Sequence, residues 1–490
     1  MTTNVGQEPH ERLTGAHSLA AIVGFLVCVE LASGILQGYY TPIFSDIAVH
    51  LGILDADVNW FEAAQLIVSA LCVPLLARLG DMVGAKYVLL LSTAITAVGS
   101  WILAFAPSFT TFLIGWALQG AYVIWLPMEV AIVYRRTAGS GRQNLLTRRA
   151  AGILVGALEL AVIIGALTSG AIVETTSMTV VLMLPAIVVT VCFFLILFGI
   201  ERDPGRSGGR FDLIGFLLIT DVIGLVMAGL ITIRLQGADS PLAWILIALG
   251  LASLAPFIIY ESRHEEPIID VRLFASRLQW PVQLTALLFG MSVLGAQIPL
   301  STFARTDPDV AGYGLGADAA FVSTLIGVYV VFLAVGAFSL PLTTRLFGPR
   351  GALILSALLV ALGYALWLPF HDSTTQALVN MAVVGVGSGA LVAALPASAA
   401  AGAPPERTGF ATGMTNATKT IGGAIASAIF AIALTSTGSL EDPTEGHAPL
   451  SVYLTVWSVC AVAALLAALA LLMMPKVSTS LPEPSEGARV

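Results

Sequence analysis

The sequence predicts an all-α integral membrane protein with fourteen transmembrane helices. Its 490 residues are 57% hydrophobic and only 11% charged, whereas an average soluble domain is about 25% charged. A soluble chain of this length would need a polar surface that this sequence lacks, so we expect lipid around it. The apolar segments are hydrophobic on all sides rather than alternating, which favours helices over a membrane β-barrel.

Fourteen segments are long and apolar enough to cross a bilayer, because about 20 helical residues span the ~30 Å hydrocarbon core. We place them at about residues 18–42, 57–77, 86–106, 110–134, 150–173, 178–199, 213–234, 241–260, 281–304, 319–342, 351–370, 375–400, 408–436 and 449–474. The connections are short. Residues 1–17 and 475–490 are polar tails, so we expect no folded soluble domain.

The distribution of Lys and Arg predicts that both termini are cytoplasmic. With the N-terminus inside and the spans alternating, 19 of the 22 Lys and Arg fall on the inner side. This is the distribution that the positive-inside rule describes. A wrong number of spans would scatter these residues over both sides, so the bias supports fourteen.

A weak internal repeat indicates two parallel halves. Gly84-Ala85-Lys86 follows the second span, and Gly348-Pro349-Arg350 follows the tenth, 264 residues later. Both segments fall on the inner side. Glycine suits a tight turn there because it adopts positive φ without strain at a Cβ atom.

Four segments carry a resemblance to the major facilitator superfamily, and within it to the fourteen-span drug:proton antiporters. The segment from Gly80 to Lys86, GDMVGAK, resembles the family signature Gly-Asp-Arg-x-Gly-Arg-Arg. Gln119-Gly120 is similar to part of the family's fourth-span motif. Residues 211–219 resemble the opening of the first extra helix, and residues 406–429 resemble the thirteenth span.

The resemblance implies the major facilitator fold, with two six-helix bundles and two extra helices between them. The expected units are a tail (1–17), the N-terminal bundle (18–200), a linker with two extra spans (201–280), the C-terminal bundle (281–474) and a second tail (475–490). The resemblance also implies a conformational-switch loop formed by Gly80, Asp81, Gly84 and Lys86. The chain departs from the family at Trp116, where the fourth span usually carries an Arg.

Ionisable side chains inside the spans are the candidates for function, because charge at membrane depth is costly. Glu30 and Glu159 lie near the middle of their spans, and we expect both to exchange protons. Glu129 lies about two turns from the inner face. It either lines the cavity with them or pairs with Arg135 or Arg136.

Other polar and aromatic residues in the spans have two interpretations each. Lys419 occupies the position of a family Arg, and it either contacts substrate or an acid, or only joins helices. Asp221 lies at mid-membrane in an extra helix, where it either contacts the core bundles or lies on a route for lipid headgroups. The remaining substrate-binding candidates, which ordinary packing would also explain, are Tyr39, Tyr122, Trp125 and Asn416.

These observations predict a secondary active transporter rather than an enzyme. No Gly-x-x-x-x-Gly-Lys-Ser/Thr sequence occurs, so we expect a proton gradient as the energy source, with no cofactor and no metal. The leading hypothesis is multidrug efflux of amphipathic or cationic small molecules by proton antiport and alternating access. Proton-coupled uptake and export of lipid or cell-envelope components stay open. We expect contact with membrane lipids, no nucleic-acid partner and a monomer.

Overall fold

The computed structural model describes residues 23–137, 143–201, 212–264, 267–404, 408–436 and 448–475. Within these residues the regular structure is helical, and twelve helices are long and apolar enough to cross a membrane. One of them, Ala319–Leu366, contains two of the expected spans, joined where Gly348 leaves helical geometry. The first expected span is represented by Leu26–Tyr39. The chain is therefore a multi-pass membrane protein, while the count of fourteen stays a prediction.

The N-terminal part is a bundle of helices from α2 to α9. Its elements are α2 (Leu26–Tyr39), η1 (Thr41–Ile43), α3 (Phe44–Leu51), η2 (Asp55–Asp57), α4 (Val58–Val83), α5 (Ala85–Ala104), α6 (Phe109–Gln119), η3 (Gly120–Ile124), α7 (Trp125–Arg136), α8 (Gln143–Ile172) and α9 (Met178–Gly199). α2 packs on α8, and α5 packs on α9 and α6. The expected span 110–134 is broken, because a short 3-10 segment separates α6 from α7.

The rest of the chain forms a two-helix hairpin and a second bundle. The hairpin consists of α10 (Leu213–Gln236) and α11 (Pro241–Glu261). The second bundle contains α12 (Val271–Phe274), α13 (Trp280–Val293), α14 (Gln297–Arg305), α15 (Pro308–Ala311), α16 (Ala319–Leu366), α17 (Thr374–Ala401), α18 (Thr408–Ser436) and α19 (Leu450–Leu471). α16 packs on α17 and α19, and α13 packs on α18.

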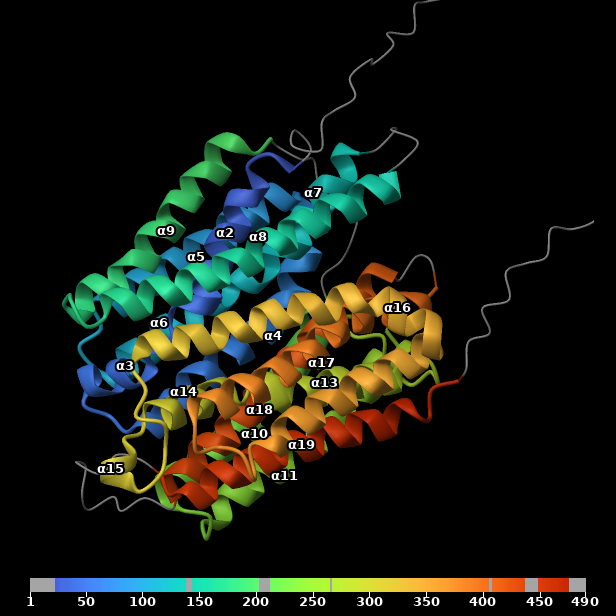
Figure 1. Ribbon diagram of the computed structural model, residues 1–490. Helices are drawn as coiled ribbons and strands as arrows, with labels where there is room; N and C mark the ends of the chain where they lie inside the picture. The colour runs from blue at the N-terminus through green and yellow to red at the C-terminus, as the bar shows by residue number, and fades with distance from the viewer. Residues whose placement is uncertain are drawn as a thin grey trace, which may run out of the picture.

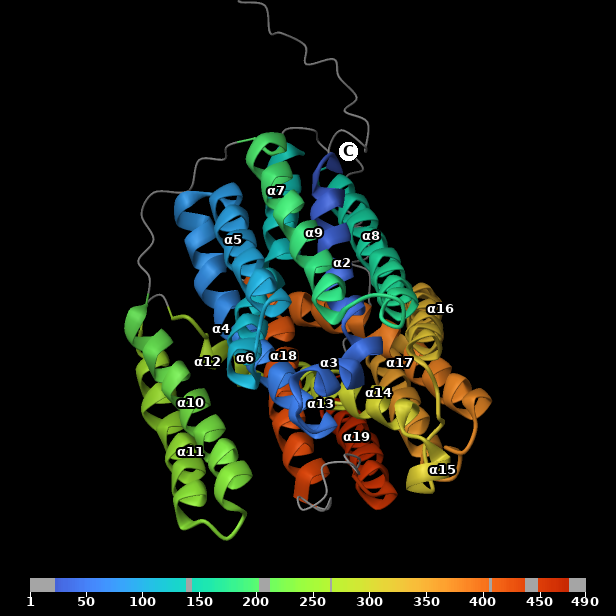
Figure 2. The same ribbon diagram turned by 90° about the vertical axis from the view of Figure 1, so that its left-hand side faces the viewer.

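The two bundles lie one against the other, and the hairpin stands at the edge (Figures 1 and 2). α4 packs on α18, and α8 packs on α16, so two helix pairs join the bundles. The hairpin contacts the bundles mainly through α18. This arrangement agrees with the expected two bundles plus two extra helices, and the domain boundaries stay a prediction.

Glycines allow the helix backbones to touch at the main crossings. A Cβ atom on Gly38 of α2 would overlap the carbonyl oxygen of Val162 on α8. A Cβ atom on Gly389 of α17 would overlap the carbonyl of Leu333 on α16. Because lipid tails are as apolar as the side chains, membrane helices associate through such close packing.

The internal repeat seen in the sequence has a structural counterpart. Gly84 and Gly348 both have positive φ, 100° and 73°. Lys86 then donates to the carbonyl oxygens of Leu197, at 2.9 Å, and Ile200, at the end of α9. Arg350 donates to the carbonyl oxygen of Leu472, at the end of α19. In each half, the cation after the glycine turn therefore caps the last helix of its own bundle.

Two buried acidic side chains, Asp212 and Glu261, stabilise the base of the hairpin through hydrogen bonds. Asp212 Oδ1 accepts hydrogen bonds from the Gly215 amide, at 2.9 Å, and from the Tyr260 hydroxyl, at 3.0 Å. Glu261 Oε2 accepts a hydrogen bond from the amide of Ile269 in the following connection, at 3.3 Å. Asp212 and Gly215 belong to the segment 211–219 that resembles the opening of the first extra helix. Their hydrogen bond thus lies where the two helices of the hairpin are joined at its base.

We expect Gly336→Ala to lower the stability of the protein. A methyl group there would overlap the carbonyl oxygen of Val386 on α17 and push α16 away, at a cost of about 1–3 kcal/mol. Gly327→Ala on the same helix is the matched control, because no atom lies within 4 Å of the added methyl. The apparent Tm in detergent should fall for the first variant only. Equal Tm values for both variants would contradict the packing argument.

Candidate functional site

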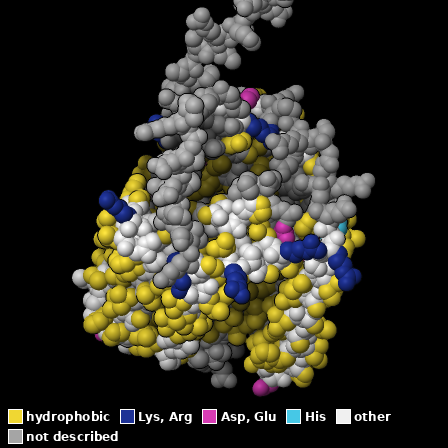
Figure 3. Space-filling model, turned by 90° about the vertical axis from the view of Figure 1, so that its right-hand side faces the viewer, with side chains coloured by type: hydrophobic (Ala, Val, Ile, Leu, Met, Phe, Trp, Pro, Cys, Tyr) yellow, Lys and Arg dark blue, Asp and Glu magenta, His cyan; other side chains and the backbone are white. Residues whose placement is uncertain are grey.

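A cleft between the two bundles is open at one end of the molecule and closed at the other. At the open end, which we call the basic end and define by Lys86, Arg136 and Arg350, the glycines Gly152 and Gly156 of α8 face open space. Figure 3 looks onto this end and shows a hollow between the bundles, apolar inside, with Lys and Arg around it. At the closed end, a Cβ on Gly170 of α8 would meet α16.

Hydrogen bonds between the bundles hold the closed end together. The Ser301 hydroxyl donates to the carbonyl oxygen of Thr41 at 2.6 Å, and the Ser323 hydroxyl donates to the carbonyl oxygen of Ala166 at 2.7 Å. Arg305 Nη2 pairs with Asp46 Oδ1 at 2.8 Å. Burial raises the pKa of the Asp46 carboxyl, and the positive charge of Arg305 opposes that rise. All these contacts must break if the cleft is to open at this end.

Two of the expected acids form a pair inside the N-terminal bundle. The side chains of Glu30 on α2 and Glu129 on α7 are completely buried, and their carboxyl groups are close enough for their charges to interact. No hydrogen-bond partner is found for the four oxygens among the described residues. Two buried carboxylates at close range repel each other, so a proton held on one of them would stabilise the pair.

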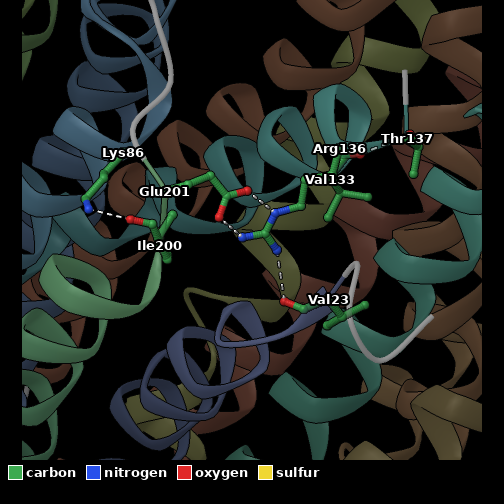
Figure 4. A network of polar contacts seen from close by, with 7 residues as sticks. All are labelled: Val23, Lys86, Val133, Arg136, Thr137, Ile200 and Glu201. Carbon is green, nitrogen blue, oxygen red and sulfur yellow. Dashed lines mark hydrogen bonds and ion pairs between the residues drawn. The ribbon is translucent and has the colours of Figure 1, made fainter. Parts of the chain in front are cut away.

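The two acids lie at the same depth because of how their helices are joined at the basic end. Arg136 Nη1 approaches the carbonyl oxygen of Val23 at 3.5 Å, which brings the ends of α7 and α2 together (Figure 4). Glu30 is seven residues beyond Val23, and Glu129 is seven residues before Arg136. At 1.5 Å per residue, both carboxyls lie about 10 Å from this contact.

The possible pairing of Glu129 with Arg136 is wrong, because Arg136 binds another acid. Its guanidinium contacts both carboxylate oxygens of Glu201, at 2.6 and 2.8 Å (Figure 4). This hydrogen bonding lowers the pKa of Glu201, which lies outside the spans. Lys86 binds the neighbouring Ile200, so one network joins α2, α5, α7 and α9 at the basic end.

The third expected acid, Glu159, faces the other bundle rather than Glu30. It lies on α8, half-buried, and its charge interacts with that of Lys419 on α18. Tyr329 of α16 is also within reach of the Glu159 charge. Opposite charges on the two bundles attract, so this pair depends on how the bundles are placed relative to each other.

The break between α6 and α7 determines where two other residues lie. The 3-10 segment Gly120–Ile124 begins where Gly120 meets α4, because the Ser69 hydroxyl donates to the Gly120 carbonyl at 2.9 Å. Tyr122 in this segment is close enough to Glu62 and Glu30 to sense both charges. Glu62 is itself a buried acid, 8% exposed, one turn inside α4.

The remaining substrate candidates differ in their exposure. Tyr39 and Trp125 are completely buried. The Tyr39 hydroxyl donates to the Val181 carbonyl, and the Trp125 indole donates to the Ser92 hydroxyl at 3.1 Å. Asn416 is half-buried on α18, as are Tyr122 and Lys419. Among these five candidates, only Tyr122, Asn416 and Lys419 have side-chain surface that a solute could contact in this conformation. Their roles in binding stay predictions.

The expected switch loop joins α4 to α5 at the basic end. A Cβ on Gly80 would contact the sulfur atom of Met128, the neighbour of Glu129. Gly84 makes the turn, and Lys86 caps α9. Asp81 lies in the last turn of α4, and its side chain is outside the described part of the structure.

The departure at Trp116 has a structural role. Its indole is buried and packs on Tyr40, with ring centres 4.6 Å apart, and on Phe112 at 5.7 Å. The family's Arg position is thus part of an aromatic core here. Gln119, one turn further, donates hydrogen bonds to Tyr40 and Ser100 at 2.9 and 2.8 Å.

Some residues near the cleft were missed in the sequence. Gly290 of α13 lets that helix touch the backbone of Lys419, since a Cβ there would overlap its carbonyl oxygen. Thr418 donates to Gln283 Oε1 at 3.2 Å. Gln283 could have been found from the sequence, because an amide side chain in an apolar span needs a hydrogen-bond partner. No group of three or more His, Cys, Asp or Glu able to hold a metal occurs among the described residues.

Two helical bundles around a cleft, with buried acids at membrane depth, are the architecture of a membrane transporter. Comparison of the sequence with known families agrees. A family model described as "Major Facilitator Superfamily" matches residues 26–306 and 286–489. The chain belongs to this superfamily.

Several relatives in the superfamily are exporters, and one transports nucleosides. The chain is 23% identical to the multidrug transporter protein MdtP of Bacillus subtilis, over 75% of this chain and 66% of the relative. It is 27% identical to the cephamycin export protein CmcT of Amycolatopsis lactamdurans, over 88% and 87%. It is 24% identical to a uridine/deoxyuridine transporter of Lactococcus lactis, over 65% and 66%. For the first and third relatives, the match spans just under two thirds of their length.

Solved structures with the same fold include transporters of two kinds. The nucleoside transporter NupG has a TM-score of 0.62 at 15% identity, covering 93% of this chain and 99% of that one. An auto-inhibited POT family peptide transporter has a TM-score of 0.68 at 15% identity, covering 94% and 98%. At this identity, the likeness shows the fold alone.

We expect Glu201→Gln to destabilise the basic end in a pH-dependent way. The pKa of Glu201 lies below its usual value of 4.5, so its pair with Arg136 adds stability above that pH and loses it as the pH falls further. Because Glu201 is largely exposed, the effect is at most about 1 kcal/mol. The Tm difference between wild type and variant should be present at pH 7 and shrink as the pH falls below 4.5. A difference independent of pH would rule out the ion pair.

Proposed function

We propose that this protein is a proton-coupled exporter of amphipathic, often cationic, small molecules. The observation that carries the proposal is the buried Glu30–Glu129 pair in the bundle that borders the cleft, because two buried carboxyl groups at close range favour a bound proton. A charge at membrane depth is costly, and residues that accept that cost are usually functional. The similarity to multidrug and antibiotic exporters supports the direction of transport.

The mechanism we infer is alternating access between the two bundles. By the positive-inside rule we place the basic end on the cytoplasmic side, which would make this conformation inward-open and both termini cytoplasmic. Substrate would enter the cleft there. Opening of the closed end would separate Asp46 from Arg305 and Thr41 from Ser301. Outside protons would then load the acid pair as substrate leaves.

The available energy is sufficient for this work. One proton moving through a membrane potential of ~100 mV releases about 2.3 kcal/mol. A tenfold substrate gradient costs about 1.4 kcal/mol. One proton per cycle can therefore sustain a gradient of some tens-fold, and no cofactor is needed beyond the proton gradient.

Uptake of a polar solute is the second candidate function. It is favoured by the polar group of Lys419, Thr418 and Gln283 on the C-terminal bundle, and by the similarity to a uridine/deoxyuridine transporter. Such groups suit a solute with many hydrogen-bonding atoms better than a lipophilic cation. Proton-driven accumulation of radiolabelled uridine in right-side-out vesicles would select this function.

For the leading function, we expect Glu30→Gln and Glu129→Gln each to abolish proton-driven transport. An amide cannot exchange a proton, so accumulation of the lipophilic cation ethidium in everted vesicles with an acid interior should fall from some tens-fold to the passive level. Asp221→Asn is the matched control, because it removes a carboxyl group outside both bundles. Full proton-driven accumulation by both glutamine variants would overturn the proposal.

A further inference from the structure

The outward face of the hairpin carries a carboxylate for which the fold provides no partner. Asp221 lies in the middle of α10 and is exposed, and among the described residues it makes no hydrogen bond or ion pair. Leu230, nine residues further, packs against the bundles with Trp60 and Ala428. Nine residues at 100° each turn by half a circle, so Asp221 faces away from the bundles.

The hairpin is also the least buried part of the transmembrane region. Only 22% of the α10 window and 17% of the α11 window are buried, whereas the other candidate spans range from 33% upward. Figure 2 shows α10 and α11 at the edge of the molecule, with one side turned away from it. An ionisable group on such a face meets lipid, where it costs several kcal/mol unless a partner is present.

The residues around Asp221 have the spacing of a helix-pairing seam. Alternate steps of four and three residues connect six positions on this face: Leu217, Asp221, Gly224, Ala228, Ile231 and Leu235. This 3.5-residue repeat is the pattern by which helices pack as a left-handed coiled coil. The seam runs over 19 residues, from Leu217 to Leu235, and its ends lie about 27 Å apart, close to the thickness of the hydrocarbon core.

The small residues of the seam provide the close approach that membrane helices need. Nothing lies within 4 Å of the position that a Cβ on Gly224 would occupy. By contrast, Gly229 and Gly250, which face the α10–α11 contact, are tightly packed. Gly224 and Ala228 thus leave a shallow groove, on the same face as Asp221, that a second helix can enter.

We propose that this seam is the interface between two copies of this chain, which replaces the monomer expected from the sequence. All copies in a membrane have the same orientation, so two α10 helices related by a two-fold axis run parallel. In a parallel pair, each seam position lies opposite its own equivalent. Asp221 then faces Asp221 of the second copy, and two carboxyl groups can share a proton. A single polar residue in such a seam also fixes register and the number of helices.

The dimer is tested with the full-length protein in liposomes by single-molecule photobleaching over a range of protein-to-lipid ratios. The wild type should show two subunits at ratios where Asp221→Leu shows one, a loss of about tenfold in affinity or ~1.4 kcal/mol. Asp221→Asn should retain the dimer, because two amides can hydrogen-bond to each other. A wild type that is monomeric at every ratio, or equal dimerisation by Asp221→Leu, overturns the proposal.

Oxidative cross-linking then locates the interface. Gly224→Cys should form a disulfide-linked dimer more readily than the wild type, whose four native cysteines supply the background. Ile245→Cys on α11 is the matched control, since that residue also faces lipid, at 53% exposure, but lies outside the seam. Equal cross-linking at both positions, or a cross-link from Gly224→Cys to a different protein, overturns the proposal. Neither result bears on transport, so the proposed function is tested independently.

Discussion

This fold depends on direct contact between helix backbones. In lipid, the hydrophobic effect does not drive helices together, and what remains is dispersion, hydrogen bonding and close fit. Gly38 lets α2 touch α8, and Gly389 lets α17 touch α16. Gly290 brings α13 against the backbone of Lys419. The glycines therefore set the positions of the charged groups as well as the stability of the bundles.

The buried charges fall into two sets that respond to different events. Glu30 and Glu129 belong to one bundle and interact with each other, so their interaction does not depend on the opposite bundle. Glu159 and Lys419 lie on different bundles, and any rocking motion changes their separation. An ion-coupled transporter needs both kinds of group: one to hold the driving ion, and one whose contacts differ between the two conformations.

Most of the architecture could be predicted from the sequence, because hydropathy and the placement of Lys and Arg reflect the bilayer directly. The repeat of Gly84 and Gly348 was also visible. The pairing of Glu30 with Glu129 was not, since it depends on the break at Gly120–Ile124, and a 3-10 segment has no distinct hydropathy. The role of Trp116 could not be read either, because an aromatic core is defined by partners far away in the sequence.

The repeated glycine turn leaves the two bundles unequally stiff. On the N-terminal side, the capping Lys86 belongs to a network that also includes Arg136 and Glu201. On the C-terminal side, Arg350 reaches only the carbonyl of Leu472 at the end of α19, among the residues that the structure describes. The N-terminal bundle is therefore cross-linked at the basic end by several polar contacts, whereas the C-terminal bundle has one such contact there among the described residues. If the two bundles move relative to each other, deformation should therefore concentrate in the bundle built from α13 to α19, while the bundle from α2 to α9 should turn as one rigid body.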